Sequence, residues 1–168
     1  MEAARVLVVM GVSGSGKTTV GAMLAGRLGW EFVDGDDFHP AVNVAKMHAG
    51  HPLTDEDRWP WLDSIGAWIR AVVATGGRGV VACSALKRIY RDRLGGGRPE
   101  VLFVLLEGDE ALIAARQGAR HGHYMPASLV ASQFATLESP GDGERVMEVS
   151  VDRAAAEVVA AAAARVLA

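Results

Sequence analysis

The chain has 168 residues, a length that suits one domain and is too short for two full ones. Half of the residues are hydrophobic, which is enough for a good core. Its formal net charge of −3 argues against a partner with a phosphate backbone, so no nucleic-acid binding is expected. The single cysteine, Cys83, excludes an internal disulfide framework, and no apolar run is long enough to span a membrane. We therefore expect a cytoplasmic protein without membrane partners.

Short apolar strands alternate with helical stretches along the chain. The expected strands are 5–10, 31–34, 79–83, 101–106 and 146–151, and the expected helices are 17–28, 41–49, 55–74, 85–94, 110–120, 127–137 and 153–167. Strands such as 101–106, VLFVLL, are apolar on both faces, as in a parallel sheet covered by helices on both sides. The pattern predicts a three-layer α/β protein with ligands at the carboxyl ends of its strands. The closing helix is expected only to pack.

The first strand leads into GVSGSGKT, residues 11–18, which fits the phosphate-binding pattern G-x-x-x-x-G-K-[ST]. Its glycines suit a backbone with positive φ, and the following helix adds positive potential at its N-terminus. Lys17 would reach the β- and γ-phosphates of ATP, and Thr18 would offer its hydroxyl to Mg²⁺. A plain glycine-rich turn is the alternative. The expected nucleotide-binding residues are Gly11, Val12, Ser13, Gly14, Ser15, Gly16, Lys17, Thr18 and Thr19.

The second strand ends in an acidic stretch, Asp34-Gly35-Asp36-Asp37. It comes at the same edge of the predicted sheet as the phosphate loop. Asp34 would therefore hold Mg²⁺ through water, and Asp36 would orient an alcohol and accept its proton. Asp-Gly-Asp is also ordinary turn chemistry, and this stretch alone leaves both interpretations open.

Polar residues beyond this turn suit an anionic substrate that carries several hydroxyls. His39, Asn43 and Lys46 lie on or beside a short helix that follows the acidic stretch. Arg58 is in the first turn of the long helix, where it would either clamp a carboxylate or remain a surface residue.

The third strand leads to a second group of polar residues. Ser84 would cap the helix that follows it. Lys87 and Arg91 are four residues apart and would look out from one face of that helix. The cation for a substrate carboxylate is then Arg58, Lys87 or Arg91, and the pattern does not choose among them.

Two arginines, Arg116 and Arg120, follow the fourth strand and precede a segment bounded by Pro126. This arrangement predicts a lid at about 116–126 that closes over the nucleotide, with Arg120 stabilising charge on the transferring phosphoryl group. His121 and His123 are interpreted as lid packing, because no further Cys/His cluster supports a metal site.

Four stretches together resemble the gluconokinase family of P-loop small-molecule kinases. They are MGVSGSGKTTVG, DGDDFHPAVNVAKMHAGHPLTDEDRWPWL, CSALKRIYRDRL and ARHGHYMPASLVASQFATLESP. The resemblance implies ATP- and Mg²⁺-dependent phosphorylation of D-gluconate at its 6-hydroxyl, often by a homodimer, in a fold with strand order 2-3-1-4-5. A more distant likeness to shikimate kinases implies Asp34 near the metal, Asp36 at the acceptor hydroxyl and Arg116 beside the adenine.

The expected site follows from these observations within one kinase domain, 1–168. Lys17, Asp36 and Arg120 are the predicted catalytic residues, and Thr18 and Asp34 the metal ligands. The predicted substrate-binding residues are Asp36, His39, Asn43, Lys46, Arg58, Ser84, Lys87 and Arg91. Two alternatives are a kinase of another acidic alcohol, such as shikimate or another sugar acid, and a nucleotide-dependent switch without an acceptor. The absence of an N-K-x-D stretch argues against the switch.

Overall fold

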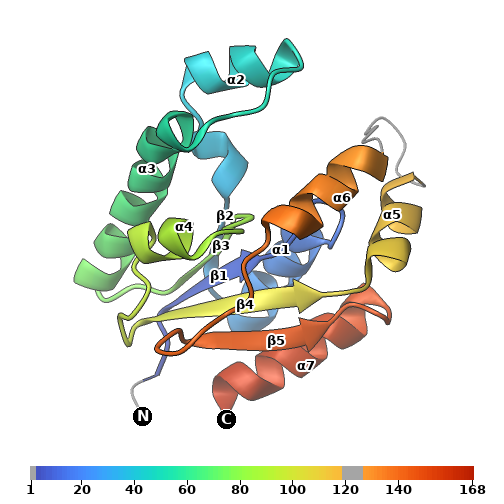
Figure 1. Cartoon of the computed structure of the whole chain (residues 1–168). Coiled ribbons are helices and arrows are strands. Elements are labelled where there is room, and N and C mark those ends of the chain that lie inside the picture. Colours follow the sequence, from blue (N-terminus) through green and yellow to red (C-terminus); the bar gives the residue numbers. More distant parts are fainter. Residues whose placement is uncertain (1–2, 119–126) are drawn as a thin grey trace.

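The computed structural model describes residues 3–118 and 127–168, in which helices cover both faces of a central sheet (Figure 1). The strands are β1 (Val6–Met10), β2 (Glu31–Asp34), β3 (Gly79–Ala82), β4 (Val101–Glu107) and β5 (Val146–Ser150). They pair in parallel in the order β2-β3-β1-β4-β5. The predicted three-layer α/β fold and its strand order are thereby confirmed.

The helices connect these strands and form the outer layers. They are α1 (Lys17–Leu28), α2 (Ala41–His48), α3 (Asp55–Ala74), α4 (Arg88–Arg93), α5 (Glu110–Gly118), α6 (Ala127–Thr136) and α7 (Ala155–Leu167), with a short 3₁₀ helix, η1 (Gly35–Phe38). Figure 1 shows α2 standing apart from the layers that enclose the sheet. No helix in the described part of the chain is both long and apolar enough to cross a membrane.

The central strand β1 is fully buried and divides the core into two parts. Leu7 and Val9 pack with residues of α1 and α7 on one face. Val6, Val8 and Met10 pack with residues of α3 and α4 on the other. Burial on both faces explains why every position of this strand is apolar.

The bounds of α3 agree with those predicted, and its N-terminus is closed by a capping box. Thr54 Oγ1 accepts the Asp57 N–H at 3.1 Å, and Asp57 Oδ2 accepts the Thr54 N–H at 2.9 Å. Pro60 is the sixth residue of the helix, beyond its first turn, and cannot donate a backbone hydrogen bond to the carbonyl of residue 56. These contacts fix the segment that carries Asp55, Asp57 and Arg58.

The prediction of a helix over 85–94 was wrong at its start. Helix α4 begins at Arg88, and Ala85 before it has a φ of 47°, which a right-handed helix cannot contain. Ser84 therefore does not cap this helix; Lys87 is at the cap position. The carbonyl of Ser84 instead accepts the Gly11 N–H at 3.2 Å, so residues 83–87 form a loop held against the phosphate loop.

Candidate active site

The loop between β1 and α1 has the geometry of a phosphate cradle. Gly11, Gly14 and Gly16 have φ values of 146°, 84° and 95°, as their spacing predicted. An added Cβ at Gly11 would lie 2.9 Å from Ser15 Oγ and 3.1 Å from Leu106 O, so no side chain fits there. Helix α1 begins directly after Gly16, which brings the positive end of its dipole to the same loop.

Donors within the loop converge on one carbonyl oxygen. Val12 O accepts hydrogen bonds from the Ser15 N–H at 3.2 Å, from Ser15 Oγ at 2.7 Å and from Lys17 Nζ at 3.0 Å. The ammonium group of Lys17 is therefore held against the loop that would bind the phosphates.

Thr18 and Asp34 bring the ends of β1 and β2 together, although β3 lies between these strands. Thr18 Oγ1 donates a 3.3 Å hydrogen bond to Asp34 Oδ2, and Asp34 Oδ1 accepts the Asp36 N–H at 3.0 Å. Among the described residues, no cluster of three or more His, Cys, Asp or Glu side chains could hold a metal. One hydroxyl and one carboxylate fit Mg²⁺, which keeps several waters and takes its remaining ligands from nucleotide phosphates.

Asp36 is in η1, just beyond the carboxyl end of β2. Much of its surface is exposed, yet enough protein surrounds the carboxyl group for desolvation to raise its pKa, and the negative charge of Asp34 raises it further. His39 and Lys17 oppose this change. A carboxylate with a raised pKa beside a phosphate loop is a candidate general base.

Trp61 of α3 fixes the acidic turn in place. Its indole Nε1 donates to Gly35 O at 2.7 Å, and the ring stacks on His39 with centroids 4.2 Å apart. Gly35 has no room for a side chain, because an added Cβ would lie 2.3 Å from Ala82 O. Burial lowers the pKa of His39, so the imidazole is neutral at neutral pH.

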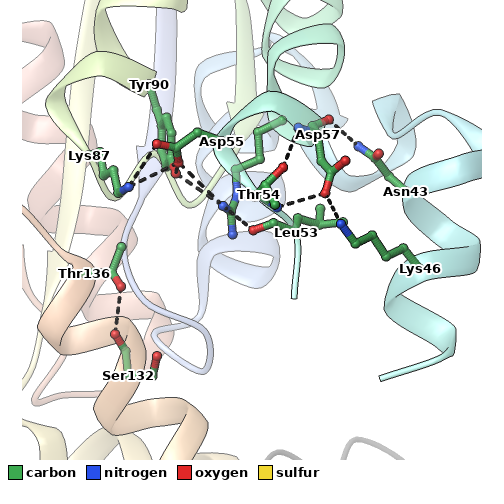
Figure 2. Close-up of polar contacts among 11 residues, drawn as sticks. Asn43, Lys46, Leu53, Thr54, Asp55, Asp57, Lys87, Tyr90, Ser132 and Thr136 are labelled. Carbon is green, nitrogen blue, oxygen red and sulfur yellow. Dashed lines mark hydrogen bonds and ion pairs between the residues drawn. The ribbon is translucent and has the colours of Figure 1, made fainter. Parts of the chain in front are cut away.

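Asn43 and Lys46 connect α2 to the first turn of α3 (Figure 2). Asn43 is buried, and its Nδ2 donates to Asp57 O at 2.9 Å and lies 3.3 Å from His39 Nδ1. Lys46 Nζ donates to Asp57 Oδ2 at 2.5 Å. This bond and the Thr54 N–H lower the pKa of Asp57 to about 2. Both predicted residues therefore hold α2 against the first turn of α3.

Arg58 and Lys87 meet at the carboxylate of Asp55, and Figure 2 shows the contact of Lys87 with this carboxylate. Lys87 Nζ lies 3.1 Å and 3.2 Å from the two carboxylate oxygens, and Arg58 Nη1 lies 3.9 Å from Oδ1. The Tyr90 hydroxyl donates a short hydrogen bond to the same carboxylate, and this bond, followed by that of Lys87, lowers the pKa of Asp55. Each cationic side chain remains 31% exposed, so both are accessible to an anionic ligand.

Arg91 does not look outward, and the geometry contradicts its predicted position. Its side chain is fully buried and pairs with Glu144, with Nε 2.6 Å from Oε1. Its guanidinium also donates to the carbonyl oxygens of Ala85, Leu86 and Glu138 at 2.9, 3.1 and 3.0 Å. With these partners, Arg91 supports the 83–87 loop and has no side-chain surface to offer a substrate.

A pocket of about 340 Å³ lies between the phosphate loop and the start of α7. It is lined by Ser15, Gly16, Thr19, Val20, Arg116, Val151, Arg153, Ala154, Ala155 and Val158. Arg116 Nη2 donates to Arg153 O at 3.4 Å, which places the predicted adenine-side arginine at this pocket. The structure thus brings Arg116 and Thr19 together with the loop.

Sequence reasoning missed two contributions to the site. Val151, Arg153, Ala154 and Ala155 line the pocket, although nothing beyond packing was expected of the C-terminal tail. The rule that ligands bind beyond the carboxyl ends of strands, applied to β5, would have pointed to them. Gln117 and Gln133 contact Ser13 in the phosphate loop, and no local pattern marks either residue. Arg120, His121 and His123, with most of the predicted lid, lie outside the described residues.

The parallel sheet, the glycine-rich loop and the adjoining acidic turn together define a P-loop kinase. A family model described as an AAA domain matches residues 6–140. The chain is 53% identical to the gluconokinase of Gluconobacter oxydans (strain 621H), over 89% of this chain and 84% of that protein. It is 46% identical to a probable gluconokinase of Rattus norvegicus, over 96% of this chain and 97% of that protein.

A solved structure agrees with these relatives. The crystal structure of a gluconokinase from Sinorhizobium meliloti 1021 matches with a TM-score of 0.86 and 46% identity, over 98% of this chain and 91% of that one. The chain belongs to the gluconokinase family, as the four stretches of its sequence predicted.

Proposed function

We propose that this protein transfers the γ-phosphoryl group of ATP to the 6-hydroxyl of D-gluconate, giving 6-phospho-D-gluconate and ADP. The observation that carries the proposal is the 3.3 Å hydrogen bond between Thr18 Oγ1 and Asp34 Oδ2. It joins a phosphate cradle to an acidic turn that can receive an alcohol. Membership of the gluconokinase family supports gluconate as that alcohol.

On the donor side, the loop residues 11–18 bind the triphosphate through backbone N–H groups, and Lys17 binds the β- and γ-phosphates. The pocket beside Arg116 accommodates the adenosine portion. Thr18 and, through water, Asp34 would hold Mg²⁺, which neutralises phosphate charge when bound. Arg120 is proposed to stabilise charge on the transferring group.

On the acceptor side, the carboxylate of gluconate binds Arg58 and Lys87, which already share the carboxylate of Asp55. His39, Lys46 and Ser84 contact the sugar-acid hydroxyls, and the buried Asn43 positions His39 and the first turn of α3 beside them. Asp36 orients the 6-hydroxyl and accepts its proton, for which its raised pKa suits it. Arg91 is left out of this set because its guanidinium is buried against Glu144.

One test measures 6-phosphogluconate formed from gluconate, ATP and Mg²⁺, with 6-phosphogluconate dehydrogenase as the coupling enzyme. A second measures ADP release over a panel of sugar acids and shikimate, and without any acid. Gluconate should be the preferred acceptor, and ADP release should depend on it. Preference for another acid, or ATP turnover that needs no acid, would overturn the proposal.

Lys17→Ala is the inactive control for this assay. We expect kcat to fall on the order of 10²-fold or more, because the variant lacks a preorganised cation for the transition state. A variant that keeps its turnover would remove Lys17 from the proposed catalytic residues. A homodimer and a cytoplasmic location remain predictions. Size-exclusion chromatography with light scattering would test the homodimer.

A further inference from the structure

The apex of the phosphate loop is held by glutamines of two helices. The Ser13 N–H donates to Gln133 Oε1 of α6 at 2.5 Å, and Gln117 Nε2 of α5 donates to Ser13 Oγ at 3.0 Å. Gln117 is 4% exposed and packs against the loop so closely that a Cβ on Gly14 would lie 2.9 Å from its Oε1. The loop's internal bonds converge on Val12, so these two contacts support the part of the loop farthest from β1 and α1.

Just beyond Gln133, the residues that follow α6 hold the loop that carries Lys87. Glu138, two residues beyond the helix, donates its N–H to Leu86 O at 2.7 Å, and its Oε1 accepts the Arg88 N–H at 3.0 Å. Arg91 Nη2 donates to Glu138 O at 3.0 Å. Gln133 is in the last turn of α6, and Glu138 follows five residues later, just outside the helix. One short stretch of chain thus contacts both the phosphate loop and the loop after β3.

We propose that residues 133–138, the last turn of α6 and the residues that follow it, set the separation between the phosphate loop and the substrate-side loop, with Gln133 and Glu138 as positioning residues for phosphoryl transfer. The inference rests on the proposed kinase function. Transfer between two bound molecules is sensitive to their relative placement, and a displacement of about 1 Å can cost on the order of 10²-fold in rate. Neither side chain has to touch ATP or the acceptor to act in this way.

The test compares four variants of the full chain. Gln133→Met keeps the length of the side chain without its acceptor, and Glu138→Ala removes the contact to Arg88. Glu138→Gln retains an acceptor, and Ser139→Ala changes an exposed neighbour. The first two should each lower kcat about tenfold with both KM values within about twofold, while Glu138→Gln and Ser139→Ala retain kcat.

The double variant Gln133→Met/Glu138→Ala tests whether one segment serves both loops. If it does, the double variant is no slower than the slower single variant, whereas independent contacts would multiply their effects. Multiplied effects, or unchanged kcat in Gln133→Met, would overturn the inference.

Amide exchange at Ser13, measured by NMR, supplies a readout that does not depend on activity. Gln133→Met should accelerate exchange of this N–H, and Ser139→Ala should not. Unaccelerated exchange would overturn the inference. Lack of gluconate-dependent turnover in the unmodified protein would instead overturn the proposed function, so the two failures are distinguishable.

Discussion

Asp36 shows how a single residue acquires a chemical role from its surroundings. An Asp-Gly-Asp stretch alone is compatible with a turn, and the residue does lie in one, the 3₁₀ helix η1. What favours a role in proton transfer is its raised pKa, which comes first from desolvation and then from Asp34, at the mouth of a phosphate loop. The turn and the candidate base are therefore the same feature.

Asp36→Asn is expected to lower kcat by roughly 10²–10⁴-fold if general-base catalysis contributes. Because the base acts in its ionised form, kcat/KM of the unmodified enzyme should fall as the pH drops through a pKa above the ordinary aspartate value of 3.8. The measurement is the pH profile of kcat/KM, from which this limb should disappear in the variant.

Stability separates this loss of activity from unfolding. A carboxyl group whose pKa is raised on folding destabilises the folded protein where it is ionised, above that pKa. Asp36→Asn should therefore be at least as stable as the unmodified protein at pH 7, as measured by its Tm. Unchanged turnover in this variant would show that Asp36 has only a structural role in the turn.

Arg116 makes a second prediction at the scale of a residue. Its guanidinium bonds to Arg153 O beside the phosphate loop, and its side chain lines the pocket proposed for adenosine. Arg116→Ala should raise the KM for ATP about tenfold, or about 1.4 kcal/mol, and leave the KM for gluconate unchanged. Steady-state kinetics with each substrate varied would test it, and an unchanged KM for ATP would contradict the adenine-side assignment.

At the scale of an element, the N-terminus of α3 is both a helix cap and part of the site. Asp57 closes the capping box with Thr54 and also pairs with Lys46 of α2. Asp55, in the same turn, pairs with Lys87 and Arg58. The positions of Arg58 and Lys87, which are proposed to bind the substrate carboxylate, therefore depend on the conformation of the first turn of this helix.

Thr54→Ala should reduce the free energy of unfolding by about 1 kcal/mol, the usual cost of losing a capping side chain. It should also raise the KM for gluconate, because the first turn of α3 carries the partners of Lys46 and Lys87. Urea denaturation and gluconate kinetics measure the two effects. Thr75→Ala is a matched control at the other end of the helix, where the hydroxyl bonds Ala71 O and Val72 O; it should leave the KM unchanged.

At the scale of the whole molecule, a buried ion pair joins distant parts of the chain. Arg91 and Glu144 are 53 residues apart, and their side chains are 0% and 6% exposed. Because Arg91 also binds three backbone carbonyls, the pair connects α4, the loop after β3 and the approach to β5. The hydrogen bond from Arg91 is the main cause that lowers the pKa of Glu144. The ion pair therefore stabilises the folded protein at neutral pH, and this contribution is lost as the pH falls below the usual glutamate range.

Arg91→Ala is expected to destabilise the protein by about 3–5 kcal/mol, because it leaves Glu144 buried without its partner. Arg93→Ala provides the comparison, since Arg93 pairs with Asp63 at 3.0 Å on the surface, with exposures of 39% and 59%. That variant should lose only about 1 kcal/mol. Denaturation of both variants tests the contrast, and equal losses would show that burial of the pair does not determine its contribution.

Local sequence was sufficient for the features that depend on local physics. The glycines of 11–18 imposed the course of the phosphate loop, and apolar runs on both faces of strands such as β1, β3 and β4 implied a covered parallel sheet. Helix α3 begins at the predicted position, where the side chain of Thr54 caps it. The strand order came from the family resemblance, because parallel strands of similar composition do not specify their own neighbours.

Long-range contacts decided the rest. Spacing predicted that Arg91 and Lys87 lie on one face of a helix. In the structure the helix begins only at Arg88, and the buried guanidinium of Arg91 bonds Glu144 and the carbonyl of Ala85. Gln133 reaches Ser13 across 120 residues, so no window of sequence could reveal that contact. The sequence by itself determined that a loop of the phosphate-binding pattern follows a buried strand. Only the tertiary structure determined which charged groups face that site and which ones hold it together, because a buried charge lies where its partner is, and the partner is set by the packing of the whole chain.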